Sequence, residues 1–194
     1  TYTVQGNILA GPHVAQAMAR AFENASGELA ERLYAALKAG DDAGGDRRGR
    51  QSASILVVRK GGGSSLNNDR LCYINVDDNP DPLLELGRLV PLQLAWSLSG
   101  KRGPLVQRGE FAQAMSLADN LVRWAPRNGG HRIHQGFIAY LTGNQEKALA
   151  ALRRAWELDP AGYEAALKAV LSAPATAAYR KAMEDPAFAE RIPQ

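Results

Sequence analysis

A glycine-rich turn with three arginines stands directly before an apolar run. This glycine–arginine loop covers residues 44–52 and reads Gly-Gly-Asp-Arg-Arg-Gly-Arg-Gln-Ser. The run after it, residues 53–58, is apolar and partly β-branched, which is typical of a buried strand. Domains that combine helices and strands place much of their binding chemistry in polar, glycine-bearing loops at strand ends. The sequence therefore predicts a ligand site in this loop.

Two interpretations of the charged residues in the loop stay open. Arginine binds a carboxylate or phosphate through two parallel hydrogen bonds, and neighbouring glycines let backbone N–H groups approach a ligand. The alternative is an internal salt-bridge network in which Asp46 pairs with one arginine and holds the loop against the strand. The residues concerned are Asp46, Arg47, Arg48 and Arg50.

Four uncharged polar side chains are further candidates for binding a ligand. Gln51 and Ser52 would offer hydrogen bonds at the mouth of the strand, but no histidine or lysine lies near Ser52 in the sequence to activate it as a nucleophile. Gln5 and Asn7 alternate on one face of a predicted strand and could donate hydrogen bonds to a developing oxyanion. The plainer alternative for this pair is to satisfy backbone groups at a strand end.

Strands and helices are predicted on both sides of the loop. Residues 1–9 favour a strand, and Pro12 suits the first turn of a helix that continues to residue 23. A second helical pattern covers residues 29–40 and leads into the loop. Residues 53–59 and 71–76 are predicted strands.

A cluster of aspartate and proline at residues 77–82 marks a predicted domain boundary. Every segment after it has a helical pattern. We therefore expect two domains: an α/β domain over residues 1–82 and a helical domain over residues 83–194.

The helical part contains an internal repeat. A glycine, an alanine and a proline recur at an interval of 34 residues, at Gly109/Gly143, Ala114/Ala148 and Pro126/Pro160. Small residues where helices cross, with a proline closing the second helix, are typical of tetratricopeptide-like helix pairs. Residues 161–191 are expected to form a capping pair. The residues predicted to form the core of this part are Trp124, Phe137, Leu141, Leu149, Leu152 and Trp156.

Charge and hydropathy argue against two classes of partner. Lysine and arginine number 23 against 20 aspartates and glutamates, which gives a net charge of +3, and the cations are scattered along the chain. A nucleic-acid-binding face would need them clustered, so we expect no nucleic acid partner. Because no apolar run approaches the roughly 20 residues that span a bilayer, we expect no membrane partner either.

Histidine and cysteine usage does not predict a metal site or a cofactor. Cys72 is the only cysteine, which excludes an internal disulfide and a cysteine-based metal site. His131 and His134 are spaced for one helix face, but no carboxylate or cysteine lies beside them at ligand spacing. We expect these two residues and His13 to be ordinary surface or cap residues.

Three motifs occur in order along the first part of the chain. They are Val-Gln-Gly-Asn-Ile-Leu-Ala-Gly-Pro at residues 4–12, the glycine–arginine loop with Ala53, and Asn-Val-Asp-Asp-Asn-Pro-Asp-Pro at residues 75–82. Together they resemble a bacterial family of unknown function with an N-terminal-nucleophile (Ntn) hydrolase-like fold. The resemblance covers residues 1 to about 86. The helical repeat resembles a C-terminal extension that varies among such proteins.

The resemblance implies an α+β fold. Part of an αββα sandwich would be followed by an all-α, tetratricopeptide-like helical region. Members of the family carry further residues first, including the opening hairpin of the sandwich, and usually have glycine where this chain has Thr1. We therefore expect the chain to supply the C-terminal half of the domain, with the other half missing or present as a separate chain.

The same resemblance makes Thr1 a candidate nucleophile. In Ntn hydrolases a newly exposed N-terminal threonine attacks an amide carbonyl through its hydroxyl, while its own α-amino group accepts the proton. The usual α-amino pKa, near 7.7, suits that role at neutral pH. The alternative is that Thr1 marks only the end of a processed or truncated chain.

Two functions follow from these predictions. The first is an Ntn-hydrolase-like protein that acts on an amide bond. The second is a non-catalytic interaction or scaffold module that uses the helical repeats. The candidate partners are the N-terminal half of the domain as a second chain, a second copy of this chain, and a peptide or protein held at the repeats.

Overall fold

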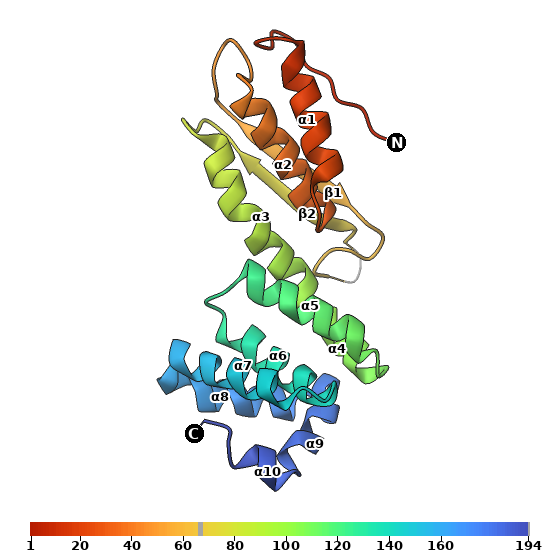
Figure 1. The fold of residues 1–194 in the computed structure, drawn as a ribbon, viewed down its shortest axis with the longest axis vertical. Coiled ribbons are helices and arrows are strands. Elements are labelled where there is room, and N and C mark those ends of the chain that lie inside the picture. The colour runs from red at the N-terminus through yellow and green to blue at the C-terminus, as the bar shows by residue number, and fades with distance from the viewer. Residues whose placement is uncertain (66–67, 194) are drawn as a thin grey trace. The chain divides into compact units, whose positions relative to one another are not determined.

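The structure of the chain is a computed structural model that describes residues 1–65 and 68–193. It is mostly helical, with a small two-stranded sheet (Figure 1). Two compact units divide the chain, unit 1 over Thr1–Ser97 and unit 2 over Leu98–Gln194. The sequence placed a boundary at residues 82/83, whereas these units meet inside a helix, α3 (Pro82–Ser99).

Unit 1 begins with two helices that pack against each other, α1 (Pro12–Asn24) and α2 (Leu29–Asp42), as the sequence predicts. Pro12 stands in the first turn of α1, where its missing N–H costs nothing. Glu28 and Glu31 form a capping box at the start of α2. A Cβ at Gly40 would lie 2.7 Å from Cγ of Met18, so glycine at this position lets the two helices approach closely.

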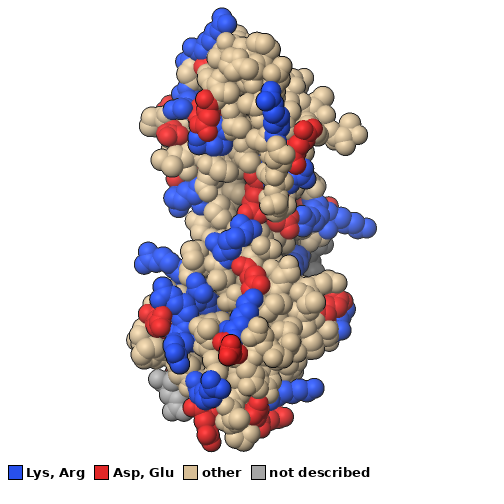
Figure 2. All heavy atoms as spheres, in the orientation of Figure 1, with Lys and Arg blue, Asp and Glu red and all other residues tan. Residues whose placement is uncertain are grey.

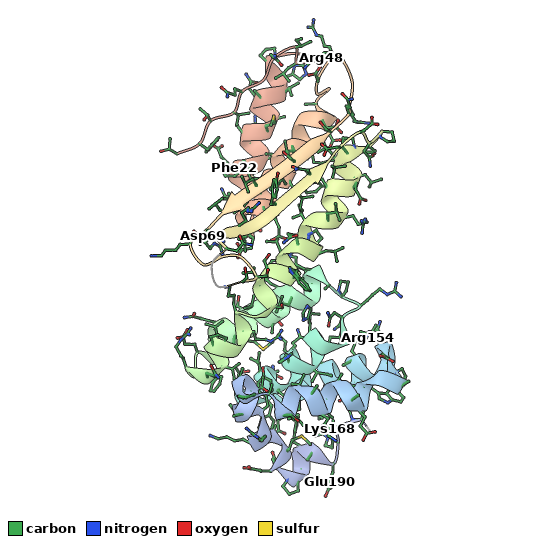
Figure 3. All side chains as sticks on the ribbon, turned by 180° about the vertical axis from the view of Figure 1, so that it is seen from behind. Phe22, Arg48, Asp69, Arg154, Lys168 and Glu190 are labelled. Atoms are coloured by element: carbon green, nitrogen blue, oxygen red, sulfur yellow. The ribbon has the colours of Figure 1, made fainter. Side chains whose placement is uncertain are left out.

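The sheet consists of β1 (Ala53–Val58) and β2 (Arg70–Val76), which pair antiparallel with Ile55 opposite Ile74. One face is buried, and α2 packs against β1. The other face exposes apolar side chains: Leu56 is 54%, Val58 63% and Tyr73 48% exposed. Figure 3 shows this sheet in front of α1 and α2, with no helix of unit 1 over it.

The predicted strand over residues 1–9 is wrong. The segment forms only an isolated bridge between Leu9 and Asp46, and most of its side chains are exposed. A strand needs a neighbour that pairs with its N–H and C=O groups. In the described part of the chain, β1 pairs with β2 alone, so residues 1–8 have no strand paired with them.

Unit 2 is a succession of packed helices. They are α4 (Arg102–Gln107), α5 (Phe111–Trp124), α6 (Gly129–Leu141), α7 (Gln145–Leu158) and α8 (Pro160–Ser172), then the 3₁₀ helix η1 (Pro174–Tyr179), α9 (Arg180–Met183) and α10 (Pro186–Ala189). Asn128, Asn144 and Asp159 cap α6, α7 and α8 by accepting a backbone N–H three residues ahead. No helix among the described residues combines the length and apolar character needed to cross a bilayer.

Two of the three pairs of the sequence repeat occupy matching environments, whereas Pro126 lies in the turn before α6 and Pro160 is the first residue of α8. Gly109 and Gly143 both adopt left-handed backbone, with φ of 73° and 82°, in the turns before α5 and α7. Ala114 and Ala148 are both fully buried. The repeat therefore marks equivalent turns and helix contacts in the two halves of unit 2.

The predicted core of unit 2 is mostly confirmed. The buried members are Trp124, Phe137, Leu149 and Leu152, and Leu141 is partly buried against them. The prediction for Trp156 is wrong, because this side chain is 37% exposed. The buried stripe of α7 is centred on Ala148, Leu152 and Ala155, which places Trp156 at its rim.

A substitution at Gly136 tests how closely α6 packs on α7. A Cβ there would lie 2.8 Å from Cγ of Leu152 and 3.0 Å from the backbone O of Ala148. We expect Gly136→Val to lower the free energy of unfolding of unit 2 by about 2 kcal/mol through overpacking. Urea denaturation, followed by the fluorescence of buried Trp124, measures this change.

Gly100→Val is the matched control, because nothing lies within 4 Å of a Cβ at Gly100. Its effect should stay within about 0.5 kcal/mol. Equal effects of the two substitutions would contradict the close crossing of α6 and α7.

Candidate functional site

The glycine–arginine loop is held in place by backbone contacts at both ends. Gly44 and Gly45 have φ of 106° and 52°, a conformation that favours glycine and turns the chain away from α2. The N–H of Ala10 donates to the O of Gly45 at 2.9 Å, and the N–H of Arg47 donates to the O of Ile8 at 3.0 Å. The N–H of Asn79 donates to the O of Gln51 at 2.9 Å, so the loop is anchored just before β1 begins.

Asp46 and Arg48 form a two-point ion pair inside the loop. Nε of Arg48 donates to Oδ1 of Asp46 at 2.9 Å, and a guanidinium N–H donates to Oδ2 at 2.6 Å. The backbone N–H of Arg48 also donates to Oδ1, at 2.8 Å. Hydrogen bonds from Arg48 lower the pKa of the Asp46 carboxyl from 3.8 to about 2. The internal pair that the sequence suggested as an alternative therefore exists.

A second pair ties the loop to the end of α2. Nε of Arg50 donates to Oδ1 of Asp41 at 2.6 Å, and a second guanidinium N–H donates to Oδ2 at 2.9 Å. These bonds raise the pKa of Arg50. Sequence reasoning missed Asp41, although a carboxylate in the last turn of a helix is unfavourable next to the helix dipole and so indicates a nearby cation.

A cavity of about 740 Å³ lies beside the two ion pairs. Apolar side chains of α1, α2 and the start of α3 line part of it, including Val14, Leu37 and Leu83. The polar residues that line it are Asp41, Asp46, Arg48, Arg50, Gln51 and Ser52. The structure thus gathers five of the predicted site residues around one cavity that offers both guanidinium donors and carboxylate acceptors.

The other predicted site residues do not line this cavity. Gln5 lies at a second, mostly apolar cavity of about 330 Å³ between residues 2–5, the helices α1 and α2, and β1. Thr1, Asn7 and Arg47 have exposed side chains. Among the described residues, Arg47 makes no ion pair within 4 Å. The roles assigned to these four residues stay predictions. Figure 3 shows Arg48 at one end of the strands and Asp69 at the other.

The histidines differ from one another. His13 contacts the backbone O of Ala43 through Nε2 at 2.9 Å, which fits the predicted cap role. The prediction for His131 and His134 is wrong: both are half-buried in unit 2, and Nδ1 of His134 lies 3.3 Å from Oη of Tyr179. Their neighbours come from segments far away in the sequence, so local spacing could not reveal this environment.

Neither metal ligands nor a reactive thiol stand out. No group of three or more His, Cys, Asp or Glu suited to a metal ion occurs in the residues that the structure describes. Cys72 is fully buried in β2, and burial raises the pKa of its thiol to about 11. The Cys72 side chain is therefore an uncharged thiol at neutral pH.

The Asp46–Arg48 pair predicts a titration. Because the folded-state pKa lies below the usual value, the pair stabilises the loop at neutral pH, and this contribution is lost as the pH falls from about 4 to about 2. We expect Arg48→Gln to move the Asp46 titration midpoint from about 2 toward 3.8, as measured by NMR of the side-chain carboxyl.

Arg88→Gln is the control, because it removes a similar exposed pair, Arg88 with Glu85, on α3. The Asp46 midpoint should not change in that variant. An Asp46 midpoint near 3.8 in the unsubstituted protein would contradict the pair.

Comparisons with known proteins give a match for the first part of the chain only. No curated protein and no solved structure matches the chain. Residues 1–86, which contain the glycine–arginine loop and both strands, match the model of a family of unknown function (DUF1028).

Proposed function

We propose that unit 1 belongs to an Ntn-hydrolase-like domain that acts on an amide bond and holds its substrate at the glycine–arginine loop. The observation that supports this most directly is the cavity lined by two arginine–aspartate pairs. An amide group carries one N–H donor and one C=O acceptor, and the cavity wall offers partners of both kinds. The resemblance in the three motifs supplies the reaction class.

The ion pairs do not exclude a ligand. The side chains of Arg48 and Arg50 are 63% and 51% exposed. Exposed ion pairs contribute little net stability, because water already solvates both partners. A substrate carboxylate or carbonyl can therefore take up guanidinium N–H groups at small cost, while Asp41 and Asp46 remain as acceptors for its N–H groups.

The sheet supports the larger sandwich that the resemblance implies. A two-stranded sheet is marginal by itself, and this one exposes Leu56, Val58 and Tyr73 on its open face. We propose that a second sheet layer covers that face and that further strands pair with the free edge of β1. The remaining half of the domain, as a second chain or as another part of a longer protein, would supply both.

The proposed reaction uses Thr1 as the nucleophile; because Thr1 does not line the loop cavity, the substrate extends from that cavity to Thr1. Its hydroxyl oxygen attacks the amide carbonyl carbon, and its α-amino group takes the hydroxyl proton and passes it to the leaving amine nitrogen. The C–N bond breaks and leaves an ester on Thr1. Water then hydrolyses the ester, which releases a carboxylic acid and restores the hydroxyl.

Substrate binding at the loop is tested with the product of the full-length gene. Incubation with a panel of amino-acid amides and N-acyl amino acids, followed by mass spectrometry, should show release of the acid and the amine. We expect Arg50→Gln to raise KM about tenfold with little change in kcat, since it removes charged hydrogen bonds to bound substrate.

Arg88→Gln should leave both kinetic constants unchanged, because its guanidinium pairs with Glu85 outside the cavity. Absence of hydrolysis across the panel would overturn the proposed reaction. Hydrolysis that is equally efficient in the Arg50→Gln variant would instead place the substrate elsewhere.

The role of Thr1 is tested through processing of the same full-length product. If Thr1 is the nucleophile, intact-mass analysis should find the bond before it cut, and Thr1→Ala should accumulate uncut chain. Thr1→Ser keeps a hydroxyl and should still be cut, and Thr3→Ala serves as a nearby control. An uncut chain in the unsubstituted protein would remove the role.

A second candidate function is protein interaction through unit 2. The observation that favours it is the matching of repeat positions, with Gly109 and Gly143 in equivalent turns and Ala114 and Ala148 in equivalent helix contacts. Tetratricopeptide-like helix pairs present surfaces that commonly hold a peptide or partner protein, including a second copy of the same chain. Under this alternative, the amide panel yields no product.

A further inference from the structure

Arg102 is a buried cation without a protein partner for one of its nitrogens. It begins α4 and is 7% exposed. Its Nη1 has no hydrogen-bond partner among the described residues, and no carboxylate of that part of the chain forms an ion pair with it. Burial lowers the pKa of the guanidinium to about 10, so Arg102 is still charged at neutral pH. A buried charge without a counter-charge is costly and calls for an explanation.

Arg102 interacts electrostatically with three hydrogen-bonding side chains from two other elements, and α4 packs on one of these elements, η1. His131 and His134 lie one turn apart on α6, and Tyr179 comes from η1. Nδ1 of His134 lies 3.3 Å from Oη of Tyr179, and the Tyr179 ring stacks on Phe137 with a centroid distance of 5.2 Å. The tyrosine is fully buried and is thereby fixed in position.

The two histidines respond to the same charge. Burial first, and then the charge of Arg102, lower the pKa of His131 to about 4 and that of His134 to about 2. At neutral pH both imidazoles are therefore uncharged, and each offers one N–H donor. The cluster carries a single positive charge, that of Arg102.

Two carboxylates that contact α6 in unit 2 are engaged with other partners. Asp119 accepts a hydrogen bond from Gln135 at 2.7 Å and pairs with Lys147 at 2.9 Å. Asp185 accepts from Oη of Tyr140 at 2.9 Å. Both carboxylates have partners on α6 or α7, which leaves the charge of Arg102 uncompensated.

We infer that Arg102, His131, His134 and Tyr179 form a binding site for a small oxyanion, the carboxylate or phosphate group of a ligand. A guanidinium fork pairs with either group through two hydrogen bonds. The His131 N–H can donate to a further oxygen. Because His134 and Tyr179 are hydrogen-bonded to each other, that pair has one donor left for the anion, either the imidazole N–H or the tyrosine O–H. His131 is also the third residue of α6, where the helix dipole favours negative charge. A metal cation is disfavoured there, because Arg102 repels it and two histidines are too few ligands.

The histidines are the solvent-accessible members of this group. Both imidazoles are partly exposed, whereas Arg102 and Tyr179 are buried. Because the anion favours protonated imidazole, bound anion should raise the pKa of both histidines.

The test is an NMR titration of the imidazoles of His131 and His134 in the full chain. Inorganic phosphate and acetate are added separately, with chloride keeping the ionic strength constant. At pH 7, where acetate and phosphate are both anionic, we expect saturable chemical-shift changes of both imidazoles when an anion binds. Saturation by phosphate alone would identify a phosphoryl site, and saturation by acetate as well would identify a carboxylate site.

Substitutions distinguish anion binding at this site from general effects of charge. Arg102→Met should weaken anion binding at least tenfold, and Tyr179→Phe, which keeps the stacked ring, should weaken it severalfold. Arg132→Gln is the matched control on α6, because the Arg132 guanidinium donates to the backbone O of Pro126 and should not affect binding. If Arg102→Met does not fold, the comparison of anion binding between Tyr179→Phe and the unsubstituted chain still tests the proposed site.

The inference is overturned if neither anion gives saturable shifts. It is equally overturned if Tyr179→Phe and Arg102→Met bind as tightly as the unsubstituted chain. In either case Nη1 of Arg102 is satisfied by water alone.

Discussion

One-sided burial of the two-stranded sheet is the constraint on which unit 1 depends. Two paired strands are marginal in water, so β1 and β2 persist because Ile55, Val57 and Ile74 are buried on the face toward the helices. Packing α2 against β1 fixes where the helix ends and where the strand starts. The glycine–arginine loop spans that short interval, and its shape follows from the two elements that it joins.

The loop in turn positions its charges through backbone geometry. Left-handed glycines at 44 and 45 turn the chain, and the bridge from Leu9 to Asp46 holds it against the segment before α1. With the backbone held at both ends, Arg48 folds back on Asp46 and Arg50 reaches Asp41. Ligand binding at the glycine–arginine loop therefore depends on the packing of α2 against β1, which fixes the loop backbone.

Regular elements were predictable because their signals are local. Helical periodicity located α1 and α2, an apolar β-branched run located β1, and alternation located β2. The loop sequence alone indicated its charged residues. Asp41 joins them only through tertiary folding. The predicted strand at residues 1–9 failed for a related reason, since strand propensity produces no strand unless a neighbour is present to pair with it.

Arg102 shows the limit of sequence reasoning most clearly. Arg102 is not among the site residues predicted from the sequence, and packing of α4 on η1 buries this arginine. The spacing of His131 and His134 suggested a metal pair or surface residues, because the cation beside them comes from a segment far from them in the chain.

The arginines of the two proposed sites differ in solvent exposure. Arg48 and Arg50 are solvated and paired, so a ligand at the loop exchanges one set of weak contacts for another, and its affinity must come mostly from the rest of the cavity. Arg102 is buried and unpaired at Nη1, so an anion there restores a missing interaction in a medium that screens charge poorly. Affinity at the loop should consequently depend on the shape of the whole substrate, whereas affinity at Arg102 should depend on charge, even for a very small anion.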